Sequence, residues 1–246
     1  MEQSKLSVQL YTVREALQDD VPGTMRRIAE IGFTNVEPYN FTGVKGLADA
    51  LAATGLSAPT AHMGFVGGDL APIFKAACTL GIGTVIDPRV NKARWQTAED
   101  IAGIAADFNA AAKVAGEYGL AVGYHNHATE LESVIGGTTA LELFASELDE
   151  GIVLELDTYW AAAAGQDPVK LLGRLGERVT ALHVKDGPAT MDNKDQVAVG
   201  SGTMPIADII NAAPTALRVI ELDDSRGDRF EAVADSFTYL VSQNLA

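Results

Sequence analysis

The sequence predicts an α/β protein folded as one (β/α)8 barrel. The chain has 246 residues, close to the roughly 250 residues typical of one such barrel. Short β-branched or apolar runs recur about every thirty residues, each followed by an Ala- and Leu-rich amphipathic stretch, as expected of parallel βα units. Hydrophobic residues make up 47% of the chain, which is enough for a large core. We therefore expect residues 1–246 to form a single domain.

Apolar runs and helix-ending glycines place the first half of the barrel. We expect strands at 6–11, 35–38, 56–61 and 84–87. We expect helices at 21–31, 46–54 and 72–80. Gly32, Gly55 and Gly81 follow these helices, at the position where glycine commonly ends a helix.

The second half begins with the longest expected helix, 98–118. Thr97 precedes it and Asp100 comes three residues later, which resembles a capping box, and Gly119 ends it. The fifth strand starts at Ala121, and three further strands are expected at 152–157, 179–184 and 217–221. Residues 185–205 form the longest irregular piece, and loops of that length are often functional.

Charge and cysteine content exclude several classes of protein. The formal net charge of −15 disfavours a nucleic-acid partner, because such proteins bind phosphates through Lys and Arg. The single Cys78 permits no intrachain disulfide, suits a reducing compartment, and is expected to be a small core residue. The N-terminus lacks the pattern of a signal peptide and no run approaches the length of a membrane span. We expect a cytoplasmic protein with no membrane partner.

Polar side chains cluster at the expected ends of the strands. Because the carboxyl ends of barrel strands face one mouth, these side chains should converge there. They are Glu37, His62, Asp87, His125, His127, Glu130, Asp157, His183, Lys185, Glu221 and Asp223.

So many carboxylates at one mouth require a compensating cation. Carboxylates within a few ångströms repel one another and raise each other's pKa unless a cation lies among them. The predicted ligands of a divalent ion are Glu130, Asp157, His183 and Glu221. Three carboxylates and one imidazole suit Mn²⁺ or Mg²⁺, with Co²⁺ as a further candidate. Glu155, deeper on the same strand as Asp157, and Glu132, next to Glu130, are alternative ligands.

Six motifs resemble one family across nearly the whole chain. They lie at 8–14, 123–130, 154–160, 182–186, 199–203 and 219–223. Together they resemble the sugar phosphate isomerase/epimerase family, with a xylose-isomerase-like TIM barrel, which includes inosose dehydratase, ketose 3-epimerases and hydroxypyruvate isomerase. The resemblance implies the same four ligands, from strands five to eight, and a proton-exchange role for Glu130 and Glu221. Ser201 and Pro205 stand where many relatives have acids.

The first functional hypothesis is therefore a metal-dependent isomerase or epimerase of a small sugar, keto-sugar or polyol derivative. The ion would chelate the carbonyl and the neighbouring hydroxyl oxygen, so that a base can remove the proton between them and form an enediolate. Lys185 could hydrogen-bond the enediolate oxygen, and His127 could act as a base. The substrate-binding candidates are His62, His125, Glu37 and Trp160.

Other functions stay open at this point. A lyase of the inosose dehydratase kind would use the same site to expel water or an aglycone from a keto-sugar or keto-glycoside. A metal-dependent abasic-site endonuclease is disfavoured by the net charge and the four histidines, and a non-enzymatic sugar-binding protein is the remaining alternative. Glycines 200 and 202 could bind a phosphate, but no Lys/Arg cluster accompanies them. A homo-oligomer is compatible with the resemblance.

Overall fold

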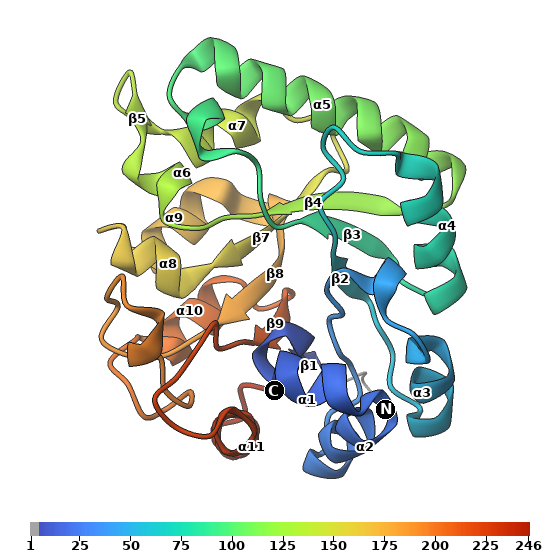
Figure 1. Cartoon of the computed structure of the whole chain (residues 1–246). Helices are drawn as coiled ribbons and strands as arrows, with labels where there is room; N and C mark the ends of the chain where they lie inside the picture. The colour runs from blue at the N-terminus through green and yellow to red at the C-terminus, as the bar shows by residue number, and fades with distance from the viewer. Residues whose placement is uncertain (1–4) are drawn as a thin grey trace.

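The computed structural model describes residues 5–246, whose strands form a curled parallel sheet surrounded by helices (Figure 1). Seven strands pair in the order β1-β9-β8-β7-β4-β3-β2, and every pair is parallel. They are β1 (Leu6–Val8), β2 (Thr60–His62), β3 (Thr84–Asp87), β4 (Ala121–His125), β7 (Val153–Asp157), β8 (Val179–Val184) and β9 (Leu217–Ile220). The predicted α/β class is confirmed.

Residues 35–39 close the sheet into a barrel between β1 and β2. The N–H of Glu37 donates to the carbonyl of Val8 at 2.8 Å, and the N–H of His62 donates to the carbonyl of Pro38 at 2.8 Å. These contacts form isolated parallel bridges rather than a continuous strand. Pro38 has no N–H to donate to a ladder, which accounts for the interruption. The predicted second strand therefore exists as a row of bridges.

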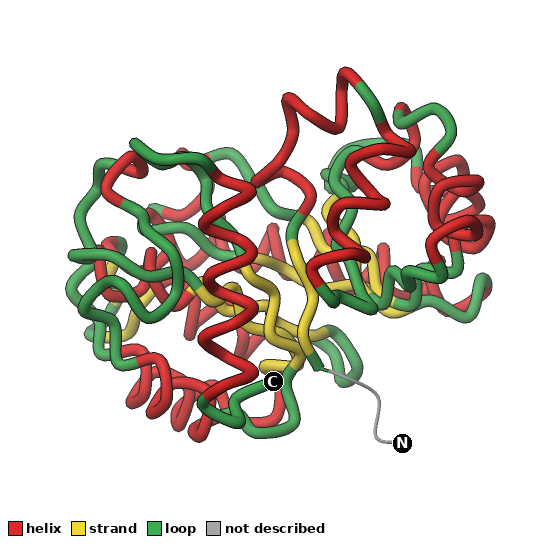
Figure 2. Tube along the Cα trace, turned by 90° about the horizontal axis from the view of Figure 1, so that it is seen from below, coloured by secondary structure: helices red, strands yellow, loops and turns green. Residues whose placement is uncertain are grey.

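The helices lie outside the strands, as the view from below also shows (Figure 2). They are α1 (Arg14–Asp19), α2 (Val21–Ile31), α3 (Leu47–Thr54), α4 (Leu70–Leu80), α5 (Ala98–Glu117), α6 (Thr129–Glu132), α7 (Ala140–Glu147), α8 (Thr158–Ala163), α9 (Pro168–Leu175), α10 (Ile206–Ala212) and α11 (Arg229–Ser242). The hydroxyl of Thr97 caps α5 by accepting from the N–H of Asp100, as predicted. None of the helices in residues 5–246 is long and apolar enough to cross a membrane.

Two small features differ from the sequence-based expectation. A two-stranded antiparallel hairpin, β5 (Val134–Ile135) with β6 (Thr138–Thr139), is inserted between α6 and α7. Cys78 is exposed on α4 and is not a core residue. The helix packs through Phe74 and Ala77, which are four and one residues before Cys78, and Cys78 lies at the exposed edge of this buried stripe.

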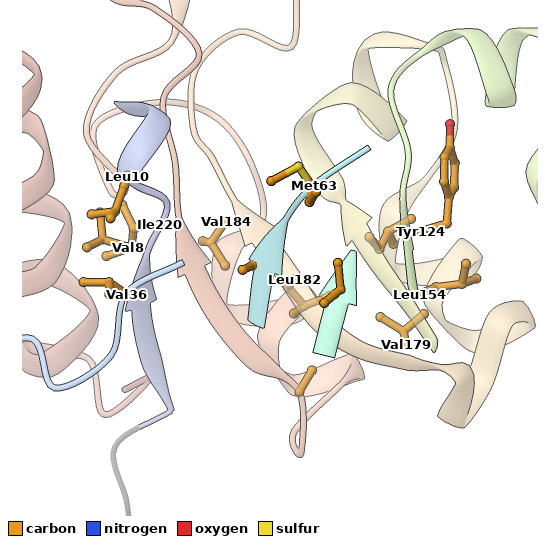
Figure 3. Close-up of a cluster of buried hydrophobic side chains, with 14 of the residues drawn as sticks. Val8, Leu10, Val36, Met63, Tyr124, Leu154, Val179, Leu182, Val184 and Ile220 are labelled. Atoms are coloured by element: carbon orange, nitrogen blue, oxygen red, sulfur yellow. The ribbon is translucent and has the colours of Figure 1, made fainter. Parts of the chain in front are cut away.

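The apolar core lies in the ring between the strands and the helices. Leu154 and Leu182, which belong to neighbouring strands, are buried in this ring (Figure 3). Alternate residues of a strand point to opposite faces. Glu155 and His183 accordingly point to the axis of the barrel, where both are buried. The interior of this barrel thus contains charged and polar side chains.

Candidate active site

The carboxyl ends of β7, β8 and β9 bring four charged side chains together. Lys185 is fully buried, and its Nζ lies 2.8 Å from Oδ2 of Asp157 and 2.7 Å from Oε2 of Glu221. The same Nζ lies 2.6 Å from Oδ2 of Asp223. Burial alone would lower the pKa of Lys185, but the three carboxylates raise it well above its usual value. The buried ammonium group therefore stays charged and compensates three acids.

A group of candidate metal ligands lies beside this lysine. His125, Asp157, His183 and Glu221 are buried, and one ligand atom of each lies within 4.8 Å of the others. Nδ1 of His183 is 2.6 Å from Oε2 of Glu221, and Nε2 of His125 is 3.7 Å from Oδ2 of Asp157. Two carboxylate oxygens and two imidazole nitrogens suit a first-row divalent ion. We call these four residues the upper group.

A second cluster lies deeper along the barrel axis. His62, His125, Glu155 and His183 also offer ligand atoms within 4.8 Å of one another, and we call them the lower group. Glu37, a predicted substrate-binding residue, lies beside this group with Oε1 2.8 Å from Nε2 of His183. Burial, followed by the charge of Glu155, raises the pKa of Glu37. Glu37 is fully buried and faces the histidines.

Glu130, a predicted metal ligand, has its carboxylate held by hydrogen bonds from neighbouring groups. Its carboxylate accepts hydrogen bonds from the hydroxyl of Tyr124 and, at 3.0 Å, from the N–H of His127. Glu130 is on the short helix α6, three residues after His127, so its side chain turns back to its own loop. Burial raises its pKa. In the part of the chain that the structure describes, Glu130 belongs to neither ligand group, and His125 takes the fourth place in the upper one.

A cavity of about 600 Å³ opens above the upper group. Five residues predicted to act in the site line it: His62, His125, His127, Trp160 and Glu221. The rest of the lining comes from Tyr11, Arg14, Tyr39, Asn40, Gly64, Pro88, Arg89, Asn193 and Asp223. The other five predicted site residues do not belong to the lining as the described residues 5–246 form it: Glu37, Glu130, Asp157, His183 and Lys185.

Burial controls the charge of the acids and imidazoles around the cavity. It lowers the pKa of His125 well below the usual value, and with the positive charge of Lys185 it lowers that of His127 to about 4. Both imidazoles are therefore neutral at pH 7. Burial also raises the pKa of Asp157 to about 6. For Glu221 the effect of burial is outweighed by Lys185 and His183, which hold its pKa well below the usual value.

The long loop 185–205 folds around one carboxylate. Oδ2 of Asp186 accepts the N–H groups of Gly200 and Gly202 at 2.8 and 3.1 Å, and Oδ1 accepts those of Gly187 and Met204. A Cβ added to Gly202 would lie 2.2 Å from Oδ1 of Asp186, so the close approach requires glycine. The N–H groups considered for phosphate are thus already bonded within the chain.

The same loop contributes a residue that the sequence did not single out. Gln196 accepts the N–H of Asp223 at 2.7 Å and donates Nε2 to Oδ2 of Asp223 at 2.8 Å. Trp160 donates its Nε1 to the same carboxylate at 3.2 Å. Arg14 donates to the carbonyl of Asp223 at 3.0 Å. Arg14 belongs to the first of the six motifs, which could have marked it, whereas no pattern marked Gln196.

Residues 25–216 match the sequence profile of a family described as "Xylose isomerase-like TIM barrel". The chain belongs to this family. Inosose dehydratase of Geobacillus kaustophilus (strain HTA426) is 26% identical over 166 residues, which are 61% of this chain. The alignment spans about half (51%) of the length of that relative.

Several solved structures share the fold over nearly the whole chain. A sugar phosphate isomerase/epimerase from Parabacteroides distasonis has a TM-score of 0.85 at 23% identity, covering 100% of this chain and 96% of that one. An L-ribulose 3-epimerase has a TM-score of 0.71 at 15% identity, covering 98% and 94%. A family member from Mycobacterium smegmatis, in complex with magnesium, has a TM-score of 0.70 at 13% identity, covering 94% and 92%.

Proposed function

We propose that this chain is a divalent-metal-dependent isomerase or epimerase of a small sugar, keto-sugar or polyol derivative. The main support is the convergence of three of the four ligands expected from the sequence. These are Asp157, His183 and Glu221, and they lie together with His125. They do so beside a cavity of about 600 Å³, within the roughly 300–1,000 Å³ range of small-molecule sites. We favour Mn²⁺ for this mixed oxygen and nitrogen donor set, with Mg²⁺ or Co²⁺ as substitutes.

A divalent ion in the upper group would polarise the substrate carbonyl and stabilise negative charge on the enediolate oxygens. His127 and Glu221 both line the cavity and are the proposed proton-transfer residues. Glu130, expected from the sequence to exchange the proton, instead holds the backbone of His127 through a 3.0 Å hydrogen bond, and we propose that it positions that loop. Lys185 places a positive charge behind Glu221.

Three further residues are proposed to hold the sugar. His62, His125 and Trp160 all line the cavity, and an indole ring is suited to stacking on a sugar. Trp160 is itself held by its hydrogen bond to Asp223. The sequence-based role of Glu37 in substrate binding becomes indirect in this proposal, because its contact is with His183 below the cavity.

A lyase acting on a keto-sugar or keto-glycoside is the second candidate. The similarity to inosose dehydratase favours it, since that relative is named for an elimination. The same proton abstraction leads to elimination when a leaving group lies on the β carbon and an acid stands next to it.

Incubation with candidate substrates in D₂O tests both candidates. Purified protein, assayed for bound metal and supplied with Mn²⁺, is mixed with a panel of ketoses, polyol ketones and 3-keto-glycosides. Deuterium at the carbon next to the carbonyl of intact sugar supports isomerisation, and loss of water or of the aglycone supports the lyase. Asp157→Asn should abolish both the metal stoichiometry and the exchange. Exchange at wild-type rate in a metal-stripped protein would refute the metal-dependent mechanism.

A further inference from the structure

One carboxylate oxygen of Glu155 contacts three imidazoles inside the barrel. Its Oε2 lies 2.5 Å from Nε2 of His62, 3.1 Å from Nδ1 of His125 and 3.1 Å from Nε2 of His183. Glu155 is 1% exposed. Its other oxygen, Oε1, has no hydrogen-bond partner among residues 5–246. The carboxylate is therefore held by the three histidines, two of which also contact Glu37, at 3.2 Å from Nε2 of His62 and 2.8 Å from Nε2 of His183.

The two ligand groups use opposite nitrogens of the same two rings. His125 turns Nδ1 to Glu155, so Nε2 is the nitrogen on the side of Asp157. His183 turns Nε2 to Glu155, so Nδ1 is the nitrogen on the side of Glu221. An ionised carboxylate only accepts hydrogen bonds, so Nδ1 of His125, which faces Glu155, carries hydrogen. A neutral imidazole with its hydrogen on one nitrogen offers the lone pair of the other one.

The strand register fixes these contacts. His125 of β4 is the direct partner of Glu155 in β7. The pairing of β7 with β8 shifts at Leu154/Glu155, and beyond the shift Glu155 pairs with the small residue Ala181 and Asp157 with His183. Bulges of this kind re-aim side chains and are frequent next to active sites. The shift places the carboxylate below the rings and Asp157 level with them.

We propose that Glu155 is a positioning residue that sets the ring orientation and tautomer of His125 and helps to orient the ring of His183, so that their outward nitrogens serve the upper group. This inference rests on the metal site of the proposed function. Carboxylates that hold metal-binding histidines in this way are a general feature of metal sites, and their loss commonly lowers metal affinity about 10- to 100-fold. On this view the lower group is a hydrogen-bonded support and not a second ion site.

Glu155→Gln tests the inference because it keeps the side-chain size and removes the charge and one acceptor oxygen. We expect the Kd for Mn²⁺, measured by electron paramagnetic resonance of free Mn²⁺, to rise about 10- to 100-fold. Glu142→Gln, which removes a carboxylate on α7, is the matched control and should leave the Kd unchanged. Circular dichroism of both variants establishes that they fold.

Nitrogen-15 NMR of the imidazoles gives a readout that needs neither activity nor a bound ion. The chain has four histidines, so their ring signals can be assigned with single variants. In metal-free wild-type protein His125 should carry its hydrogen on Nδ1, and in Glu155→Gln this preference should be lost. If the variant does not fold, the spectrum of the wild-type protein still tests the inference. Hydrogen on Nε2 of His125 in that spectrum would overturn it.

The outcomes separate this inference from the proposed function. Failure of the wild-type protein to bind any divalent ion would refute the proposed function, and the inference with it. Wild-type binding together with an unchanged Kd in Glu155→Gln would overturn the inference alone. Binding that is abolished by Glu155→Gln but unaffected by Asp157→Asn would place the ion in the lower group, and Glu155 would then be a ligand.

Discussion

Nζ of Lys185 lies 2.7 Å from Oε2 of Glu221, and both side chains are buried at the mouth of the barrel. The pair is not isolated, because the ammonium also contacts two aspartates. Oε2 of the same glutamate also lies 2.6 Å from Nδ1 of His183. Glu221 thus stands between a permanent cation and a candidate metal ligand, which links the stability of the barrel to the charge of its active site.

Replacing Lys185 by Met should destabilise the metal-free protein. The substitution leaves three acids without their cation, and breaking such a buried pair costs about 3–5 kcal/mol. Urea unfolding in EDTA measures the loss, and added Mn²⁺ should recover part of it by compensating the same carboxylates. Lys170→Met, at an exposed position of α9, should leave the unfolding midpoint unchanged. Equal midpoints for Lys185→Met and wild type in EDTA would contradict the proposed charge balance.

Replacing His127 by Gln should lower kcat about 10²- to 10⁴-fold, the usual contribution of a general base. The Mn²⁺ content should stay at the wild-type value, because His127 lies in neither ligand group among the described residues. Glu117→Gln, on the exposed end of α5, serves as the control. A variant that keeps its kcat but binds substrate less tightly would show that His127 holds the sugar rather than moving a proton.

Two Gly→Ala substitutions should change stability in opposite directions. In Gly202→Ala the new Cβ would lie 2.2 Å from both Asp186 Oδ1 and the backbone nitrogen of Gly187, and such overpacking costs about 1–3 kcal/mol. Gly173 lies in the exposed part of α9 with open space at this position, so Gly173→Ala should stabilise by about 0.5–1 kcal/mol. Chemical denaturation measures the free energy of unfolding of both variants. A stabilised Gly202→Ala variant would mean that the loop does not close on Asp186 in solution.

The ion pair between Glu142 and Arg174 should make stability depend on pH in the acid range. Burial alone would raise the pKa of Glu142, but the hydrogen bonds from Arg174, at 2.6 Å, and Thr139 lower it below 4.5. A carboxyl whose folded pKa is depressed stabilises the protein above its unfolded pKa and loses this effect as the pH falls through the folded value.

Glu142→Gln is therefore expected to be less stable than wild type at pH 7. Because the side chain of Arg174 is 46% exposed, we expect a difference of only about 0.5 kcal/mol. Unfolding curves of both proteins from pH 7 to pH 3 should show the difference shrinking below about pH 4.5. If the difference in stability between the two proteins grew as the pH fell, another group would control the pH dependence of stability in this range.

Much of the barrel could be predicted from local sequence. Gly32 ends α2 and Thr97 caps α5, because capping and left-handed backbone depend on nearby residues. The place of Glu130 could not be read in the same way. Glu130 follows the fifth strand closely enough for its side chain to reach the mouth of the barrel. The fold of α6 instead turns its carboxylate back to the N–H of His127.

The convergence of Asp157, His183 and Glu221 followed from strand alternation, since residues of equal parity share a face. The contact between Glu155 and His62 lay beyond that rule. It joins two strands that are not neighbours in the sheet, and it depends on the curvature of the barrel and the register shift next to Glu155. Such cross-barrel contacts are properties of the closed structure and have no local sequence signal.

The alternation along β7 also has an evolutionary consequence. Leu154 and Leu156 are buried on the helix side, while Glu155 and Asp157 are buried on the axis, so successive residues of one strand serve folding and chemistry separately. Substitutions at axis positions can therefore diversify the reaction while the hydrophobic ring is inherited unchanged. One barrel architecture can in this way accommodate epimerases and dehydratases without redesign of its packing.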